Sequence, residues 1–466
     1  MYAVLAAAAV LLTLTGISGW LFDRHVEDLQ LEALEGGAIP CENPCPVDRN
    51  GLEALGIEPF SSSLPVLMID TGDQEIVREE KRRVQVAVYD SRNGDNHILD
   101  DPDLLLDAKM KIRGSERPEK QQYRLNLLKP NSSKELAYPL LGMGADSRWV
   151  LQAPYADRTL MRSFLMYRLS REIMDWAPDC RFFELFVNGN YEGVYLAVEP
   201  VGVSSHRLNL SRFSLLSGDS PYVLCREKTG EEVRPLTTYA NRNGYTRRLL
   251  DLKYPDPARA TKAQTDWIQR DISAFEEALY SDRFDDPETG YANYIDMDSF
   301  VDYLILNEFA MNRDAGELST YVYKDMGGKL KLCVWDFNKS FDNYRGALPV
   351  DQWTASENTW FDRMLQDRNF AEKFQSRYAE LRQGPLSEEA LAHRILEART
   401  MLGDAAKRNF IRWSDSFSSY YVYDEKDLKR NPENYFMAVK MLEKTIENRL
   451  AFLDEAVPQL TENCVN

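Results

Sequence analysis

Histidine and cysteine are scarce in this chain of 466 residues, which has four of the first and six of the second. No Cys-x-x-Cys pair and no His-x-x-x-His spacing occurs, so we do not expect zinc held by sulfur or imidazole. The four histidines all lie far along the chain from its densest acidic cluster, which argues against a Ser-His-Asp hydrolase. They are His25, His97, His206 and His393.

Glycine-rich phosphate loops are also missing, because neither a Walker loop nor Gly-x-Gly-x-x-Gly occurs. A nucleotide would therefore need another phosphate-binding turn. Arg113-Gly114-Ser115 lies between two predicted strands and can present backbone N–H groups, with Arg113 and Lys120 neutralising charge. A surface turn with solvated cations is the alternative.

Positive charge is in deficit, since 56 Lys and Arg oppose 74 Asp and Glu for a net charge of −18. This balance excludes nucleic acid and an anionic membrane face as partners. Hydrophobic residues at 44% and charged residues at 28% exclude a disordered or multi-span membrane protein. We expect a compact mixed fold.

One long apolar run is present, from Tyr2 to Phe22, and it contains no charged side chain. About 20 such residues span a bilayer as a helix, so we expect an uncleaved signal anchor with the body outside the cell. A cleaved signal peptide, which would make the protein secreted, and a buried core helix are the alternatives. Cys41 and Cys45 follow in a stiff linker, where a disulfide would be stable outside the cytosol.

The other cysteines are spread through the body. Cys180 and Cys225 could also pair, whereas Cys333 lies in an apolar run and is expected to be a buried small side chain.

Secondary-structure signals change along the body. Residues 64–128 alternate β-rich stretches with turn residues, which predicts a small antiparallel sheet, and Asn188-Gly189 predicts a hairpin. The polar stretch 204–245 is typical of an insertion or a flexible lip, and 249–255 returns to strand. Asp157 is the expected N-cap of a helix, and beyond residue 255 the chain is mainly helical.

The densest polar cluster lies at the end of a predicted helix, in Asn307-Glu308 and Asn312-Arg313-Asp314, and one hairpin later in Asp336-Phe337-Asn338. A hairpin can bring two carboxylates to one cleft, one to accept a proton and one to bind a divalent cation. Phosphoryl transfer needs little more than this positioning and charge neutralisation. The alternative is that these acids only cap turns.

A family resemblance covers about residues 64–452 and rests on short motifs in a fixed order. They are Ile112-Arg113-Gly114-Ser115, Lys120 with Tyr123-Arg124-Leu125, Leu141-Gly142-Met143, Trp149-Val150-Leu151, Tyr155-Ala156-Asp157-Arg158 with Arg162, Val187-Asn188-Gly189-Asn190-Tyr191 with Glu199, Lys253-Tyr254-Pro255, Asp298-Ser299-Phe300, Asn307-Glu308, Asn312-Arg313-Asp314, Tyr321-Val322-Tyr323-Lys324 and Trp335-Asp336-Phe337-Asn338. By these motifs the chain resembles the CotH kinase family, named for spore-coat protein H.

The resemblance implies an α+β, atypical protein-kinase-like fold, with an antiparallel β-rich N-terminal lobe and a mainly helical C-terminal lobe after the N-terminal helix. The expected parts are the anchor 1–22, a linker 23–63, a kinase-like domain 64–457 and a tail 458–466. Within the domain, 64–200 is the β-rich part, 201–255 an insert and strand, and 256–457 the helical lobe.

The resemblance further implies ATP with Mg²⁺ or Mn²⁺, and phosphate transfer to a protein acceptor. Asp314 resembles the catalytic aspartate and Asp336 the metal-binding aspartate. Many members have Asp-x-Asp where this chain has Asp336-Phe337-Asn338, so Asn338 would be a neutral ligand. A kinase-like loop usually has Asn five residues after its aspartate, where Ser319 stands, and Asn312 is the alternative.

The expected nucleotide-binding residues are Arg113, Ser115, Lys120, Glu199 and Lys253. Glu199 could pair with Lys120 or be simply solvated, and Arg162 could anchor its helix to the site. Two other functions stay open at this point. One is a catalytically weak or inactive kinase-like scaffold, and the other is a glycosidase with paired carboxylates.

Overall fold

The structure is a computed structural model that describes residues 47–91, 94–114, 119–212, 219–227, 234–343, 346–417 and 430–464. The expected anchor 2–22 and the pair Cys41 and Cys45 lie outside the described residues. In the part of the chain that the structure describes, no helix combines the length and the apolar character needed to cross a bilayer.

The chain divides into two compact units. The first unit contains the described residues up to 114, Gln122–Leu151 and Phe183–Glu192. The second unit contains residues 119–121, Gln152–Phe182 and the described residues from Gly193 onward. The polypeptide passes between the units several times, and three strands have residues in both: β5 (Arg148–Gln152), β6 (Cys180–Val187) and β7 (Asn190–Val198).

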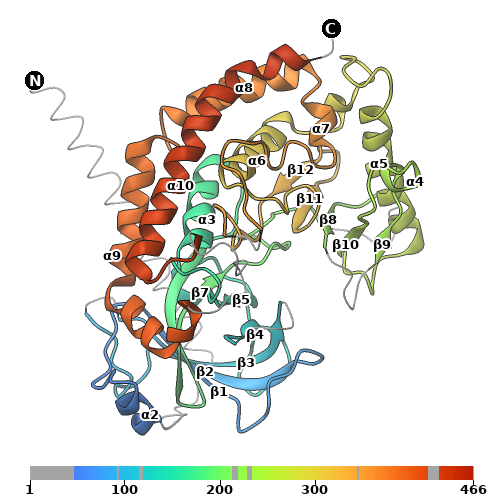
Figure 1. Cartoon of the computed structure of the whole chain (residues 1–466). Coiled ribbons are helices and arrows are strands. Elements are labelled where there is room, and N and C mark those ends of the chain that lie inside the picture. Colours follow the sequence, from blue (N-terminus) through green and yellow to red (C-terminus); the bar gives the residue numbers. More distant parts are fainter. Residues whose placement is uncertain are drawn as a thin grey trace, which may run out of the picture. The chain divides into compact units, whose positions relative to one another are not determined.

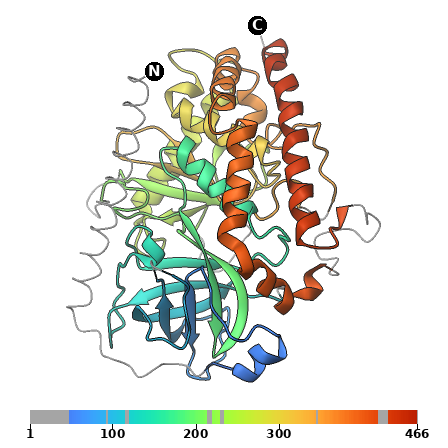
Figure 2. The ribbon, with the colours of Figure 1, turned by 90° about the vertical axis from the view of Figure 1, so that its left-hand side faces the viewer.

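The first sheet is a closed barrel with the strand order β1-β2-β3-β4-β5-β7-β6. Its strands, drawn from blue to green in Figures 1 and 2, are β1 (Val66–Asp70), β2 (Arg82–Tyr89), β3 (Leu104–Arg113), β4 (Gln122–Leu128), β5 (Arg148–Gln152), β6 (Cys180–Val187) and β7 (Asn190–Val198). The first unit also contains helix α2 (Arg49–Ala54) and the 3₁₀ turn η1 (Leu140–Gly142).

The sequence predicted the antiparallel pairs of this sheet but not its closure. Strand β1 pairs antiparallel with β2 and parallel with β6, and the parallel pair closes the barrel. The hairpin between β6 and β7 is confirmed, with Asn188 at φ 50° and Gly189 at φ 77°. Positive φ at both central residues is the geometry that Asn-Gly turns favour.

The second sheet has the order β12-β11-β8-β10-β9, and its neighbouring strands are antiparallel. The strands are β8 (Tyr222–Arg226), β9 (Pro235–Leu236), β10 (Leu250–Tyr254), β11 (Thr320–Lys324) and β12 (Lys331–Cys333). The prediction of an insertion or lip over 204–245 is wrong for β8, whose five residues are all buried. Hydrogen bonds to β10 and β11 on its two edges make this short apolar run a central strand.

The helices of the second unit, labelled in Figure 1, are α3 (Arg162–Ile173), α4 (Tyr239–Arg242), α5 (Lys262–Leu279), α6 (Met297–Phe309), α7 (Phe361–Met364), α8 (Arg368–Arg382), α9 (Glu388–Arg412) and α10 (Tyr435–Ala456). The 3₁₀ turns are η2 (Tyr291–Asn293), η3 (Ser414–Phe417) and η5 (Val457–Asn463). Helix α6 contacts α3, α8, α10 and β12, and every residue from Phe300 to Phe309 is buried. Because α6 is buried around its whole circumference over these residues, it lies in the core and gives its C-terminal end a fixed position.

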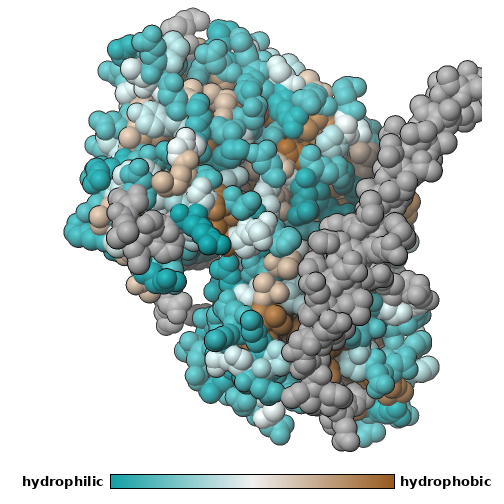
Figure 3. Space-filling model, turned by 180° about the vertical axis from the view of Figure 1, so that it is seen from behind, coloured by the Kyte–Doolittle hydropathy of each residue, from teal (hydrophilic) through white to brown (hydrophobic). Residues whose placement is uncertain are grey.

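The described cysteines are all free thiols, so Cys180 and Cys225, which the sequence left as a possible pair, do not form a disulfide. Cys180 lies on β6 and Cys225 on β8, which belong to different sheets. Cys333 is buried, as the sequence predicted. Most of the apolar side chains in the described residues are buried. Figure 3 accordingly shows a face on which hydrophilic residues predominate and the hydrophobic patches, drawn in brown, are small.

Candidate functional site

The first part of the candidate site is the turn that follows α6. The buried Asn312 donates from Nδ2 to Asn307 Oδ1 (2.8 Å), and its own Oδ1 accepts the backbone N–H of Asp314 (3.3 Å). Both ends of the Asn312 amide therefore hold the turn, which leaves this side chain poorly suited to replace the missing kinase asparagine. Ser319, the other candidate, is buried with φ 50°.

Asp314 lies on this turn with 18% of its side chain exposed. Its Oδ2 lies 3.2 Å from Lys339 Nζ, and its Oδ1 makes no hydrogen bond to another described residue. The Lys339 ammonium thus orients Oδ2, while Oδ1 can accept a proton from the hydroxyl group of a substrate.

A buried arginine, Arg226, also holds the turn that carries Asp314. Arg226 is fully buried, donates from Nη1 to the carbonyl oxygen of Gly316 (2.6 Å) and lies 3.8 Å from Glu276. Its guanidinium also lies 4.1 Å from the ring centre of Trp360. Burial lowers the pKa of Arg226, and the neighbouring Glu276 opposes that change.

The second part of the site is the segment after β12. Asp336 has φ 60°, a conformation that costs roughly 1 to 3 kcal/mol for a residue other than glycine and is concentrated at functional sites. Its backbone N–H donates to the hydroxyl of Tyr167 (3.2 Å). Tyr167 is fully buried, and burial together with the Asp336 charge raises the pKa of its hydroxyl, which therefore stays protonated.

Asn338 provides the test of whether a cation would fit. Its side-chain Oδ1 is buried and has no hydrogen-bond partner among the described residues, while its backbone oxygen accepts from Asn343 Nδ2 (2.7 Å). An orphaned amide oxygen two residues from a carboxylate is the kind of hard oxygen donor that Mg²⁺ and Mn²⁺ bind. The described residues contain no cluster of three or more acidic, His or Cys ligands. A cation held by Asp336 and Asn338 would thus depend on phosphate oxygens and water for its other ligands.

Two contacts join the loop of Asp314 to the loop of Asp336. Lys339, which contacts Asp314, is three residues beyond Asp336, and the backbone N–H of Phe341 donates to the carbonyl oxygen of Ala310 (2.8 Å). The structure therefore joins the two loops that carry Asp314 and Asp336, which the sequence proposed as base and metal ligand.

Arg162 joins helix α3 to the loop that follows Asp336. This buried side chain donates from Nε to the carbonyl oxygen of Ser340 (3.0 Å) and from Nη1 to Asp157 Oδ1 (2.6 Å). The expected anchoring role of Arg162 agrees with these contacts. The sequence predicted Asp157 as the N-cap of α3, and this prediction is wrong because Met161 occupies the N-cap position. Asp157 Oδ2 nevertheless accepts the backbone N–H of Arg162 (2.8 Å).

Lys120, the expected phosphate-side lysine, is fully buried in the second unit. Its Nζ donates to the carbonyl oxygen of Val194 (2.5 Å) and to Asn409 Oδ1 (2.8 Å), and lies 4.7 Å from the Tyr195 ring centre. A Cβ on Gly193, at φ 83°, would come within 3.3 Å of this ammonium and 2.5 Å of Asn409 Oδ1. Only glycine fits where these groups meet.

Glu199 is not brought to Lys120 as an ion-pair partner. Its Oε2 accepts the backbone N–H of Asp179 (3.0 Å) and lies 3.7 Å from Arg171 Nη1. Burial raises the pKa of this carboxyl group, against the opposing effects of the Asp179 hydrogen bond and of Arg207 and Arg171.

The remaining expected nucleotide residues are more scattered. Lys253 is half-buried at the irregular end of β10, where its charge opposes the burial that raises the pKa of the neighbouring Asp251. Arg113 ends β3 opposite Gln122 in the first unit, and Ser115 lies outside the described residues. Within the second unit, Lys253 makes no hydrogen bond or ion pair with Asp314 or Asp336 in the part of the chain that the structure describes.

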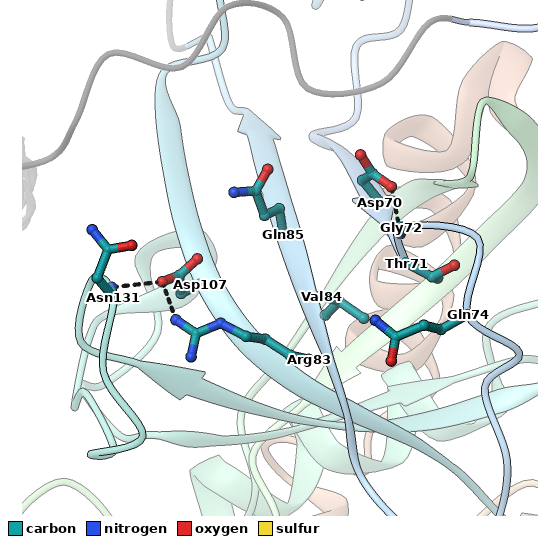
Figure 4. A pocket seen from close by; sticks show the side chains of 9 residues that line it. All are labelled: Asp70, Thr71, Gly72, Gln74, Arg83, Val84, Gln85, Asp107 and Asn131. Carbon is teal, nitrogen blue, oxygen red and sulfur yellow. Dashed lines mark hydrogen bonds and ion pairs between the residues drawn. The ribbon is translucent and has the colours of Figure 1, made fainter.

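A polar hollow of about 440 Å³ lies on the barrel, and none of the expected site residues lines it (Figure 4). Its Arg83 and Asp107 form an ion pair (2.5 Å), and Asp107 also accepts the backbone N–H of Asn131 (2.9 Å). Because these charges satisfy one another, the hollow offers no open phosphate-binding group.

Four residues that organise the site were not predicted from the sequence: Lys339, Tyr167, Arg226 and Arg449. Arg449 is fully buried and pairs with the equally buried Glu308 (2.7 Å), whose carboxylate also accepts the backbone N–H groups of Thr354 and Ala355 (2.9 and 2.8 Å). A signal did exist, because Glu308 and Arg449 each stand on the apolar stripe of a helix. A charged residue in such a position needs a buried partner.

A family model described as CotH kinase protein matches residues 110–453, which is most of the chain. The chain belongs to the CotH kinase family. The resemblance predicted from the motifs is confirmed, and this CotH family member is a kinase-like protein of mixed α+β structure. No curated protein matches it. Among solved structures, it is similar to a chain of the Shewanella oneidensis HipA, HipB and operator DNA complex, at 15% identity and a TM-score of 0.32, over 75% of this chain and 68% of that one.

Proposed function

We propose that this CotH family member is a kinase that uses ATP with Mg²⁺ or Mn²⁺ to phosphorylate a hydroxyl group of a protein acceptor. The observation that carries the proposal is the direct contact between the two acid-bearing loops, in which Lys339 Nζ lies 3.2 Å from Asp314 Oδ2 and only three residues beyond Asp336. An acceptor oxygen and a metal-bound phosphate need this proximity to react.

Each residue has a distinct task in the proposed reaction. Asp314 Oδ1 receives the proton of the acceptor hydroxyl while the acceptor oxygen forms a bond to the γ-phosphorus and the bond from that phosphorus to the β,γ-bridging oxygen breaks, releasing ADP. Lys339 holds Asp314 in position. Asp336 and Asn338 would hold the cation, which neutralises charge on the triphosphate when it is bound.

The nucleotide-binding roles of Arg113, Ser115, Lys120, Glu199 and Lys253 belong to the same proposal and rest on the family resemblance. The buried position of Lys120 supports a structural contribution as well, because its ammonium joins β7 to α9 through Val194 and Asn409. We further propose that residues 2–22 anchor the chain in the cell membrane with its body outside the cell.

A weak or inactive kinase-like scaffold is the second candidate, and one observation favours it. Asn338 is neutral and Ser319 replaces the usual kinase asparagine, so the protein supplies only one carboxylate for the cation among these positions. Fewer charged ligands lower the affinity for divalent cations.

Nucleotide binding by the full-length chain tests the proposal. We expect ATP to raise the melting temperature only when Mg²⁺ or Mn²⁺ is present, because ligand binding stabilises the folded state. Asp336→Asn should abolish this shift without lowering the melting temperature of the free protein. Wild-type protein that shows no shift with either cation would leave the scaffold as the function.

A further inference from the structure

An open hollow of about 550 Å³ lies beside the Asp314 turn in the second unit. It is lined by Gly244, Tyr245, Thr246, Arg247, Arg248 and Glu317. Five of these residues form the loop between α4 and β10, and the sixth, Glu317, belongs to the turn that carries the proposed base.

The distance from the hollow to the reaction centre is set by that turn. The backbone N–H of Glu317 donates to the carbonyl oxygen of Asp314 (3.0 Å). Residues joined in this way have Cα atoms within about 7 Å of each other. A polypeptide that presents a hydroxyl to Asp314 therefore has its neighbouring residues within reach of the hollow.

The charge of the hollow is unlike that of the chain as a whole. Arg247 and Arg248 are exposed, and neither side chain makes a hydrogen bond or ion pair with another described residue. Glu317 adds one negative charge to the lining, against the two positive charges of the arginines, and its Oε1 accepts from the hydroxyl and the N–H of Thr359. On a chain of net charge −18, two open guanidinium groups create a local field that attracts anions to this position.

The loop is held in one shape by its own contacts. The Tyr245 ring is 48% exposed but stacks on the Tyr280 ring at a centroid distance of 3.8 Å and an angle of 4°. Thr246 Oγ1 accepts the N–H of Arg248 (3.1 Å), and Asn241 Nδ2 donates to the carbonyl oxygen of Arg248 (2.8 Å). A preorganised loop loses little entropy when it binds a ligand.

We propose that this hollow binds acidic side chains that flank the phosphorylated residue of the protein acceptor. The inference rests on the proposed kinase function and names its substrate class. Guanidinium groups bind carboxylates through paired, charge-assisted hydrogen bonds, and the exposed Tyr245 ring offers apolar surface to the peptide beside them. The occupant is thus an acidic segment of a polypeptide.

Fluorescence anisotropy tests the proposal with the full-length protein and without ATP. The probes are a labelled peptide with one serine among glutamates, and the same peptide with glutamine or lysine in place of glutamate. We expect the glutamate peptide to bind at least about ten-fold more tightly than the other two peptides. Its affinity should fall as salt is added. The double variant Arg247→Glu/Arg248→Glu should lose about ten-fold or more of this affinity.

The matched control is Arg259→Glu/Arg270→Glu, which changes the charge equally at two exposed arginines outside the hollow. It should bind the glutamate peptide within about two-fold of wild type, since only local charge matters here. Equal losses in both double variants, or no loss in the first, would overturn the proposal. Binding of phosphatidylserine vesicles or heparin, but not of the peptide, through Arg247 and Arg248 would also overturn it.

The assay separates this inference from the proposed function. If Arg247→Glu/Arg248→Glu alters the melting temperature, Arg247→Gln/Arg248→Gln replaces it with a smaller change of charge. Peptide binding with no nucleotide binding would reject the kinase and retain the acidic-segment site. Where transfer occurs, the double variant should raise KM for the glutamate peptide and leave kcat nearly unchanged.

Discussion

Lys339 and Asp314 form an ion pair with 3.2 Å between Nζ and Oδ2, although 25 residues separate them in the chain. Because Lys339 follows the proposed metal ligand Asp336 by three residues, the pair connects the metal side of the site to its base. Any displacement of the loop around Asp336 would therefore also move Asp314.

The first prediction concerns Asp314 itself. Asp314→Asn should keep metal-dependent ATP binding within a few-fold and lower turnover by about 10² to 10⁴, the range expected when a general base is lost. Turnover is measured as transfer of labelled phosphate to the protein acceptor or to the glutamate peptide. Asp325→Asn, a half-buried carboxylate on another turn, is the control and should keep wild-type turnover. Normal turnover in Asp314→Asn would remove Asp314 from the mechanism.

The second prediction concerns the neutral position of the metal site. Asn338→Asp replaces the orphaned Oδ1 with a carboxylate and should tighten Mg²⁺ or Mn²⁺ binding by about ten-fold, because a charged ligand is added. The cation concentration that gives half of the maximal ATP-induced thermal shift reports this affinity. Asn369→Asp, at an exposed position near the start of α8, is a matched change of charge and should have no such effect. An unchanged cation requirement in Asn338→Asp would show that this side chain does not contact the cation.

The third prediction concerns the buried pair of Glu308 and Arg449, both with no exposed surface. Arg449→Met should lower the free energy of unfolding by roughly 3 to 5 kcal/mol, because it leaves a buried carboxylate without its partner. Burial lowers the pKa of Arg449, an effect that Glu308 opposes, so each charge depends on the other.

The double variant Glu308→Leu/Arg449→Met should recover part of the loss, since no charge remains unpaired. Glu447→Ala breaks an exposed pair on the same helix, with side chains 68% and 62% exposed, and should cost less than about 1 kcal/mol. Urea unfolding measures all four proteins. A loss in Arg449→Met no larger than in Glu447→Ala would assign the buried pair no structural role.

The fourth prediction concerns pH and Glu199. Burial raises the pKa of Glu199 above its ordinary value of 4.5, so the folded state keeps its proton at a pH at which the unfolded chain has lost it. Stability contributed by this group is present below about pH 4.5 and is lost as the pH rises through the folded pKa. Glu199→Gln removes the titrating group.

The melting temperature of wild type relative to Glu199→Gln should therefore fall as the pH rises from 4 towards neutrality, by roughly a few degrees. Glu172→Gln, at a carboxylate with 51% side-chain exposure, should track wild type. If Glu199 also acts in the nucleotide site, Glu199→Gln weakens ATP binding at neutral pH. Normal ATP binding in this variant would restrict Glu199 to its contacts with Asp179 and Arg171.

The fifth prediction concerns topology. The charge-free run 2–22 should hold the chain in the membrane with its body outside the cell. Protease added to intact cells should then degrade the body and spare a cytosolic marker. Protection of both would contradict the proposed location.

Several individual elements could be predicted from the sequence alone, and the roles of Asp314 and Asp336 stay predictions. Period-two runs identified β1 to β4, the Asn188-Gly189 turn identified the hairpin, and the apolar stripe identified α6. These signals are local, since strand alternation, turn preference and helix periodicity depend on residues close together in the chain. The order of the motifs was sufficient to identify the family, because the same motifs occur in the same order in known members.

Only the tertiary structure decided which distant residues meet. Strand β8 was missed because hydrogen bonds to β10 and β11 made a strand of five residues that polar sequence surrounds. Glu199 meets Arg171 and not Lys120, while Lys339 meets Asp314 across 25 residues. Ion pairs of this kind follow from the packing of whole elements, and no periodicity along the chain encodes them.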